Sequence, residues 1–351
     1  VRGVPGTVKG LILSRFDRLP ERTRTILHKA AVLGSSFPVS LLTALGNEPL
    51  EILSEHLNEL ERRQFLRSES FRSEPGFTFC HGLTQETIYG TLLNRDRRTI
   101  HMQAAKAIEQ SVLWLAEEQV ELLAYHFAES DEKTRAIPYL IAAAENAARR
   151  SANVLAIEHY GRAMEILPDQ TENPSDEYFQ ISIGLGTAYK FVGEYATGSQ
   201  ILQEALDQIW LWHRVENRQA VNTIRVELLH QLGDLQQRAG NYDQALEHLE
   251  SGLRILGRNA AENNPKAWRL LLDRMAWIRF RQGQLDDVLT LANQAISGLE
   301  PDNQEDPGVL ASLHNTLGGV LWQKGQLDAA ISHVYRSLQL HESIGYLWGM
   351  A

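Results

Sequence analysis

The only cysteine of the chain, Cys80, stands directly before a histidine, His81, in the stretch FTFCHGLTQETIYG. A thiol and an imidazole can form a nucleophile–base pair when the base reaches the thiol and a third group orients the ring. The apolar alternation before Cys80 predicts a strand, in which neighbouring side chains point to opposite faces. We therefore do not expect a catalytic dyad here, and the role of His81 has to come from elsewhere.

No other motif in the sequence predicts an active site. The chain has no Gly-x-x-x-x-Gly-Lys-Ser/Thr phosphate loop, because GTVKG lacks both the spacing and the hydroxyl residue, and it has no His-Glu-x-x-His or Gly-x-Ser-x-Gly sequence. Its twelve histidines are scattered without metal-ligand spacing. We expect a non-catalytic chain with no bound metal or cofactor of its own.

Composition describes an ordinary soluble protein. The 351 residues are 43% hydrophobic and 22% charged, which suits a sizeable core and exceeds what a single core usually serves. One cysteine excludes a disulfide framework and fits a reducing, cytoplasmic compartment. The longest apolar run, Ala136–Ala144, is too short to span a bilayer, and no secretory leader opens the chain. The first residue is Val1, which suggests a fragment of a longer protein.

The net charge of −10 is unevenly distributed. Residues 1–100 carry 14 Lys and Arg against 11 Asp and Glu, a balance of +3, which leaves −13 for residues 101–351. Neutralising phosphates requires a basic face, so an acidic majority argues against broad nucleic-acid binding. We expect neither a nucleic-acid partner nor a membrane partner.

The second half of the chain repeats. A small residue inside an apolar helical pattern recurs at separations of 42, 47, 43 and 42, and we call these residues the anchors: Ala144, Gly186, Gly233, Ala276 and Gly318. Seven residues after each anchor stands a turn residue: Ser151, Gly193, Gly240, Gly283 or Gly325. Further small residues recur twelve and nineteen positions after the anchors. Each unit therefore reads as helix, short turn and helix, with small side chains where two helices touch.

The first hundred residues follow a different pattern. Apolar periodicity predicts helices over VKGLILSRF, over a second stretch that begins near Pro20, and over PVSLLTAL and LEILSEHLNELERRQ. Phe65–Ser70 and Phe77–Cys80 read as short strands joined by a turn at Ser73–Gly76, and a further helix follows. Helices with a small hairpin describe a winged-helix unit. The helix before the hairpin carries an acidic series that phosphate would repel, so we do not expect DNA binding: Glu51, Glu55, Glu59 and Glu61.

The repeats resemble the tetratricopeptide repeat. The stretches LGDLQQRAGNYDQALEHLESGL (Leu232–Leu253) and LGGVLWQKGQLDAAISHVYRSL (Leu317–Leu338) carry the resemblance. Their period exceeds the usual length of about 34 residues, which implies longer helices or connectors. The resemblance implies an all-α, right-handed superhelix over residues 132–351, with about five repeats and the truncated start of a sixth at ESIGYLWGMA.

The whole chain resembles the region behind the nucleotide-binding module of signal-transduction ATPases with numerous domains. The resemblance rests on four stretches in order: VPGTVKGLILSRFDRLP, AAVLGSSF, FTFCHGLTQETIYGTLL and ELLAYHFAESDEKTRAIPYLIAAAENAARRS. It implies a bacterial protein with a winged helix at 1–97, a helical connector at 98–131 and the repeat array. It also implies an upstream ATPase domain that binds ADP or ATP with Mg, and an associated cyclase, kinase or transcription-regulator domain.

The same resemblance implies a role for His81. In related ATPases a histidine at this hairpin-to-helix junction, often within Met-His-Asp, reaches the β-phosphate of ADP and holds the closed state. The triplet here is Cys80-His81-Gly82, so the histidine is kept while the aspartate is missing. The alternative is that His81 caps the following helix or packs in the hairpin.

Offsets of −3, +1, +4 and +5 from each anchor select one face of each first helix. We call the polar and aromatic residues on this face the first-helix stripe: Lys190, Phe191, His230, Asp234, Gln237, Arg238, Asp273, Trp277, Phe280, Arg281, Asn315, Trp322 and Gln323. Aromatic and guanidinium groups together suit recognition of a protein or peptide. The alternative is that Trp277, Phe280 and Trp322 only complete the helix packing.

Together these features predict a regulatory and sensing fragment of a multidomain signalling ATPase. In this hypothesis the repeat array receives a protein or peptide partner, and the winged helix reports its presence to the nucleotide site in cis. The alternative is a freestanding tetratricopeptide-repeat adaptor or scaffold whose first hundred residues form an N-terminal cap.

Overall fold

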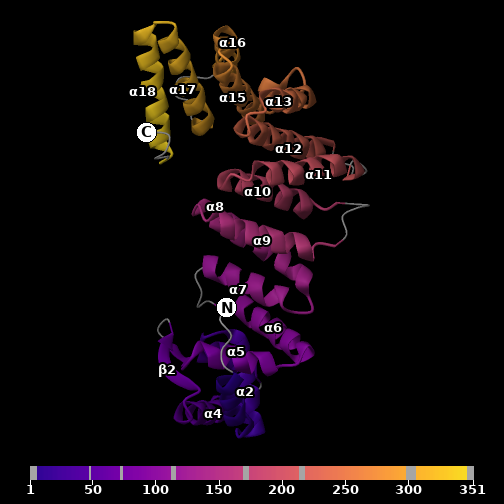
Figure 1. Ribbon diagram of the computed structural model, residues 1–351, viewed down its shortest axis with the longest axis vertical. Coiled ribbons are helices and arrows are strands. Elements are labelled where there is room, and N and C mark those ends of the chain that lie inside the picture. Colours follow the sequence, from indigo (N-terminus) through magenta and orange to yellow (C-terminus); the bar gives the residue numbers. More distant parts are fainter. Residues whose placement is uncertain are drawn as a thin grey trace. The chain divides into compact units, whose positions relative to one another are not determined.

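The computed structural model describes residues 6–46, 49–71, 74–111, 116–168, 174–212, 218–297 and 306–345. The chain divides into two compact units, Val1–Leu167 and Pro168–Ala351. Helices make up most of both units, and the only strands in the described ranges lie within the first hundred residues (Figure 1). The prediction of a mainly helical chain with one small β element is confirmed.

The first unit begins with five helices that the apolar periodicity predicted. They are α1 (Gly6–Asp17), α2 (Glu21–Leu33), α3 (Val39–Ala44), α4 (Leu50–Arg62) and α5 (Gly82–Thr91). Three of them begin directly after a proline: Pro20, Pro38 and Pro49. Proline holds the backbone near φ −65° and disfavours a helical conformation in the residue before it, so each one separates a helix from the segment before it.

A three-stranded antiparallel sheet follows the order β1-β3-β2, with β1 at Ser36–Pro38, β2 at Leu66–Phe71 and β3 at Glu74–Phe79. The β2–β3 hairpin was predicted, and Leu66 pairs with Phe79 in its register. The strand β1 was not predicted, because three residues are too few to show an alternation. Ser36 pairs with Thr78, and their hydroxyl oxygens lie 2.7 Å apart.

The predicted turn at Ser73–Gly76 is wrong, because Glu74, Pro75 and Gly76 belong to β3. Pro75 has no N–H to donate, yet β3 is the central strand. The strand β1 reaches only as far as Gly76, so Pro75 pairs with β2 alone. A Cβ atom on Gly76 would lie 2.7 Å from the Cβ of Phe71, so only glycine fits there. The Pro-Gly pair therefore marks a close strand contact and not a turn.

The first unit continues with helices through residue 166: α6 (Asn94–Glu109), α7 (Ala116–Ala128), the 3-10 helix η1 (Lys133–Ala136), α8 (Ile137–Arg149) and α9 (Asn153–Ile166). A buried polar contact joins α6 to α7, where Nδ1 of His101 lies 2.9 Å from Nδ1 of His126. The hydroxyl of Tyr89, on α5, lies 3.0 Å from Nε2 of His101. Burial lowers the pKa of His101 to about 4 and that of His126 to about 3, so both imidazoles are neutral at pH 7.

The described residues of the second unit form four helix pairs and one short extra helix. The pairs are α10 (Asp176–Val192) with α11 (Tyr195–Trp212), α12 (Arg218–Arg238) with α13 (Tyr242–Leu256), α15 (Pro265–Arg281) with α16 (Leu285–Ile296), and α17 (Pro307–Gln323) with α18 (Leu327–Ser343); α14 spans Ala260–Asn263. First helices of 17 to 21 residues account for the long repeat period. Together with α8 and α9 of the first unit, five helix pairs match the five predicted repeats.

The anchors lie where the two helices of a pair come closest. A Cβ atom on Gly186 would lie 2.7 Å from Cγ of Leu202, and one on Gly233 would lie 2.8 Å from Cγ of Leu249. Likewise, a Cβ atom on Gly318 would lie 2.7 Å from Cγ2 of Val334. Each partner belongs to the second helix of the same pair, so the predicted reason for the small anchors is confirmed. Between the pairs, Leu271 and Met275 of α15 pack into an apolar cluster with Leu246 and Leu249 of α13.

The predicted turn residues adopt the left-handed conformation. The φ angles of Gly193, Gly240, Gly283 and Gly325 lie between 75° and 86°. Ser151, the exception noted in the first repeat, also has a positive φ of 59°. A side chain is disfavoured in this conformation, so glycine recurs at the turn and serine is a strained substitute.

The predicted domain boundaries at 97/98 and 131/132 stay predictions, because both positions fall inside the first compact unit, which ends at Leu167. The first predicted repeat, α8 with α9, also belongs to that unit. Of the stretch predicted to open a sixth repeat, Glu342 and Ser343 form the last turn of α18. Ile344 and Gly345 form a turn after it, and the stretch from Tyr346 onward lies outside the described residues.

Candidate ligand-binding face of the repeats

The first-helix stripe lies on α10, α12, α15 and α17, the first helices of the four pairs in the second unit. Its members differ in exposure. The exposed ones are Phe191, Arg238, Arg281, Asn315, Trp322 and Gln323, while Trp277 and Phe280 are half-buried. The buried ones are Lys190, His230, Asp234, Gln237 and Asp273. The offsets therefore selected one face but did not separate its surface from its interior.

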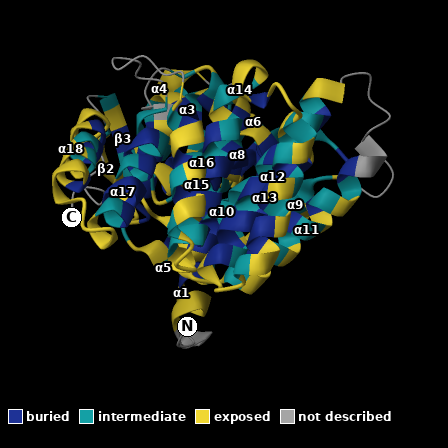
Figure 2. Ribbon diagram, turned by 90° about the horizontal axis from the view of Figure 1, so that it is seen from above, coloured by how far each residue is buried: buried dark blue, intermediate teal, exposed yellow. Residues whose placement is uncertain are grey.

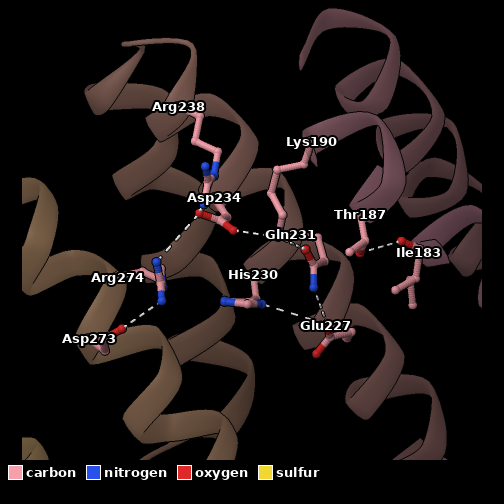
Figure 3. A network of polar contacts seen from close by, with 10 residues as sticks. All are labelled: Ile183, Thr187, Lys190, Glu227, His230, Gln231, Asp234, Arg238, Asp273 and Arg274. Atoms are coloured by element: carbon pink, nitrogen blue, oxygen red, sulfur yellow. Dashed lines mark hydrogen bonds and ion pairs between the residues drawn. The ribbon is translucent and has the colours of Figure 1, made fainter. Parts of the chain in front are cut away.

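The buried members form a polar network between helices, drawn in Figure 3. The ammonium group of Lys190 on α10 donates to Oδ2 of Asp234 on α12 at 2.8 Å and to Oε1 of Gln231 at 3.3 Å. Burial favours a neutral carboxyl, but the charges of Lys190 and Arg274 hold the pKa of Asp234 below its usual value. Asp234 is thus ionised, and its ion pair with Lys190 links two successive first helices.

Two arginines continue this network toward α15. Nε of Arg238 lies 3.5 Å and Nη1 of Arg274 lies 3.8 Å from Oδ1 of Asp234. Nη2 of Arg274 lies 3.2 Å from Oδ2 of Asp273, a carboxyl with no exposed surface. Burial raises the pKa of Asp273 although Arg274 opposes the shift. Arg274 therefore joins the carboxylates of two repeats.

Three residues of the network were missed by the sequence reasoning. Gln231 and Arg274 each stand two residues before an anchor, an offset outside the chosen set. Glu227 accepts a hydrogen bond from Nε2 of Gln231 at 2.8 Å, and Nδ1 of His230 lies 3.8 Å from the same carboxylate (Figure 3). Offset −2 is polar only in the last three repeats, where it holds Gln231, Arg274 and Thr316, and that partial pattern was the signal that could have found Gln231 and Arg274.

A pocket of about 340 Å³ opens beside this network, and we call it the basic pocket. Its lining is Tyr195, Gln237, Arg238, Gly240, Tyr242, Arg274, Trp277 and Arg281. Three of these eight residues carry a guanidinium group and none carries a carboxylate. The guanidinium carbon of Arg281 lies 5.3 Å from the centre of the Trp277 ring, a cation–π distance.

A second hollow of about 660 Å³ lies between α15, α17 and α18, and we call it the apolar groove. Its lining is almost entirely apolar: Trp277, Phe280, Asn315, Thr316, Gly318, Gly319, Trp322, Leu327, Ala330, Ile331, Val334, Tyr335 and Leu338. Trp322 is 67% exposed and Tyr335 is 64% exposed. In Figure 2, α18 is drawn largely in the colour of exposed residues, whereas α10 and α12 carry many buried ones.

The alternative that the three aromatic residues only complete the helix packing holds for Phe280 but not for Trp322. The ring of Phe280 lies against Gly319, where a Cβ atom would be 3.1 Å from its Cζ, so Phe280 fills space between α15 and α17. Trp322 does not complete the packing, because most of its surface faces solvent. Trp277 is half-buried and lines both the basic pocket and the apolar groove. The two hollows therefore adjoin at this indole ring.

His81 occupies the N-cap position of α5 in the first unit, and its side chain forms no capping hydrogen bond. Its carbonyl oxygen accepts from the amide nitrogens of Thr84 and Gln85 at 2.9 and 3.4 Å. The residue is exposed, so its imidazole is not packed in the hairpin. The structure leaves the ring free of any partner among the described residues. A role toward a bound nucleotide stays a prediction.

Comparisons with known proteins show what the chain is similar to. No family model matches the chain. An uncharacterized protein of Rhizobium meliloti (strain 1021) is 27% identical over 177 residues, which are 49% of this chain and 17% of that protein. The chain thus spans a small part of the length of the curated relative that it matches.

Two solved structures resemble the chain at low identity. The Rap conjugation gene regulator of plasmid pLS20, in complex with the Phr* peptide, is 13% identical with a TM-score of 0.50; the match covers 72% of this chain and 71% of that one. A Signal Transduction ATPase with Numerous Domains protein with a tetratricopeptide repeat sensor, from Pyrococcus horikoshii, is 13% identical with a TM-score of 0.45. That match covers 100% of this chain and 54% of that one.

The helix pairs, the anchors and the likeness to the Rap regulator define a fold of paired helical repeats, with a small β element in its first unit. Within the described ranges, no helix has both the length and the apolar character needed to cross a bilayer.

Proposed function

We propose that this chain binds a protein or peptide segment through its first-helix stripe, as the non-catalytic sensing part of a larger signalling ATPase. The observation that carries the proposal is the meeting of exposed aromatic and guanidinium side chains with an apolar groove of about 660 Å³. Such side chains supply most of the binding energy in protein interfaces. A groove lined this way fits side chains of a partner segment.

The exposed apolar side chains of the groove support this proposal. Trp322, Leu327, Ile331, Val334 and Tyr335 are between 48% and 67% exposed, and they gather on α17 and α18. Contiguous apolar patches of this kind mark interaction sites, because leaving them in water is unfavourable. A partner that covers the patch would gain about 25 cal/mol for each Å² of apolar surface removed from water.

The buried network supports the proposal in a second way. Lys190, Asp234 and Arg274 connect α10, α12 and α15, so three of the four helices that present the stripe are fixed to one another before a partner arrives. A face that is already ordered loses less conformational entropy on binding. The Rap regulator shows that a chain with a similar helical fold can hold a peptide.

The ATPase part of the proposal rests on the four stretches that resemble signal-transduction ATPases with numerous domains. In that role ADP or ATP with Mg would be bound by a domain upstream of this chain, and His81 would contact the nucleotide from the exposed end of α5. The same resemblance points to a bacterial, cytoplasmic protein with a cyclase, kinase or regulator output. The chain itself would supply sensing and no catalysis.

Selection from a peptide-display library of random dodecamers tests the binding function. The chain should enrich a defined set of peptides. Trp322→Ala should weaken their binding by more than about 1 kcal/mol, the level that separates important interface residues from the rest. Since Trp322 is largely exposed, the same change should leave the melting temperature unaltered.

Val154→Ala is the matched control, because Val154 is 65% exposed on α9 and lies outside both hollows. Failure of the chain to enrich any peptide would refute the binding function. So would enriched peptides that bind Trp322→Ala and wild type equally well.

A further inference from the structure

We propose that the partner segment is acidic, and that the basic pocket binds one of its carboxylates while the adjoining apolar groove receives its apolar side chains. This inference rests on the proposed peptide binding and specifies the chemistry of the ligand. The observation behind it is the convergence of three guanidinium groups, from Arg238, Arg274 and Arg281, on a pocket with no acidic side chain among the described residues that line it.

Arg281 is the guanidinium group most available to a ligand. It is exposed, it has no carboxylate within ion-pair distance in the described part of the chain, and it contacts the ring of Trp277. An arginine offers a planar fork of donors that matches the two oxygens of a carboxylate. Stacking on Trp277 fixes the plane of that fork at the mouth of the pocket.

Buried carboxylates hold the side chains of Arg238 and Arg274 in position. Asp234 contacts both guanidinium groups, and Asp273 contacts Arg274, but both carboxylates are buried and neither lines the pocket. The side chains of Arg238 and Arg274 keep 40% and 26% of their surface exposed, so donor atoms remain for a ligand. Buried acids that hold arginines in place lower the entropy lost when a ligand carboxylate binds.

Gln237 adds a feature that suits a peptide more than a simple anion. It lines the pocket and is 9% exposed, and its side-chain oxygen has no hydrogen-bond partner among the described residues. A buried acceptor without a donor is unfavourable. A peptide N–H beside the bound carboxylate would satisfy it, whereas inorganic phosphate at neutral pH presents mainly acceptors.

The neighbouring groove decides between classes of ligand. Trp277 lines both hollows, so a ligand seated on Arg281 continues past this ring into a space lined by Phe280, Trp322 and Tyr335. A free phosphate would leave this apolar space empty. A peptide with an acidic residue or a free C-terminus next to apolar residues would fill both hollows.

Two display libraries of random dodecamers separate the two sources of carboxylate. In one library each peptide ends in a free C-terminus, and in the other the C-terminus is joined to the carrier. We expect enriched sequences that combine apolar residues with Asp or Glu in both libraries if a side-chain carboxylate binds. Enrichment confined to the free-end library identifies the terminal carboxylate.

Arg281→Glu should weaken the best enriched peptide by about 10-fold or more, the loss expected for one charge-assisted hydrogen bond. Arg258→Glu makes the same change of charge at an exposed arginine of the same unit outside both hollows, and its affinity should equal that of wild type. Inorganic phosphate at millimolar concentration should compete only weakly.

The outcomes separate this inference from the proposed function. Enriched peptides that are neutral or basic, or acidic peptides that bind Arg281→Glu as tightly as wild type, would overturn the acidic ligand and leave peptide binding intact. Strong competition by phosphate would assign the pocket to a phosphorylated ligand and would also overturn it. The absence of any enriched peptide would refute the proposed function itself.

Discussion

At the scale of single residues, His81 presents an imidazole to solvent at the start of α5 with no side-chain hydrogen bond. Removing it should therefore leave the thermal stability of this chain unchanged, and the isolated chain should bind ADP negligibly. In a longer protein with the nucleotide-binding domain, His81→Ala should weaken ADP by about 10- to 150-fold if the imidazole reaches a phosphate.

Paired ADP titrations and melting curves of the longer protein and its His81→Ala variant measure both quantities. Equal dissociation constants would remove the nucleotide role. A lowered melting temperature would instead return His81 to a structural role, which its exposure does not predict.

The buried pair of His101 and His126 predicts acid sensitivity. Their pKa values of about 4 and about 3 lie below the usual value of 6.5, so the unfolded chain binds more protons between pH 6.5 and pH 4. Stability is therefore complete above pH 6.5 and falls as the pH drops through this window. At pH 5 the loss is on the order of 2 kcal/mol for each imidazole.

Urea titrations at pH 7 and pH 5 measure this loss. His126→Gln should show a smaller difference in unfolding free energy between the two pH values than wild type. His81→Gln removes an exposed imidazole and serves as the control, which should follow wild type. A wild-type chain equally stable at both pH values would contradict the buried neutral pair.

At the scale of elements, the anchor positions govern how closely paired helices pack. In Gly186→Ala the added methyl would meet Leu202 at 2.7 Å, and Leu202 is fully buried. We expect a loss of about 1 to 3 kcal/mol, the usual cost of overpacking a core. Gly161→Ala on α9 meets nothing within 4 Å and should raise stability by about 0.5 to 1 kcal/mol.

Opposite signs for these two glycines, read from denaturant unfolding, distinguish a packing contact from helix propensity. If Gly186→Ala were as stable as Gly161→Ala, the close approach of α10 and α11 at this position would be incorrect.

The helices were predictable because each repeat carries the same local chemistry. A small anchor and a left-handed turn seven residues later recur in every repeat, and both act within one helix pair. The sheet was only half predictable. The strand β1 is three residues long, and Pro75 and Gly76 normally signal a turn. Their place in β3 depends on where β1 ends, and this is set by tertiary contacts between segments that are distant in the sequence.

The helices that carry the candidate site were predictable from the sequence, but the burial of its side chains was not. Helical offsets placed Lys190, Asp234 and Trp322 on the correct first helices, because they depend only on the period of a helix. They could not show that Lys190 and Asp234 are buried against each other while Trp322 faces solvent. Burial depends on the packing between repeats, and so does the position of Arg274 between Asp234 and Asp273.

At the scale of the whole molecule, the chain combines a helical unit that contains a small sheet with a repeat unit that contains both hollows. We assign recognition to the second unit and the proposed nucleotide contact to the first. The central claim is that a partner segment lies in the basic pocket and the apolar groove, which are lined mainly by α12, α15, α17 and α18.

Photo-crosslinking tests this claim most directly. A peptide from the display selection is made with a benzophenone side chain in place of one apolar residue, irradiated with the chain, and its attachment sites are mapped by mass spectrometry. We predict attachment at groove and pocket residues such as Trp277, Trp322 and Tyr335. Attachment at residues outside both hollows, such as His248 on α13, or only within the first unit, would contradict this claim.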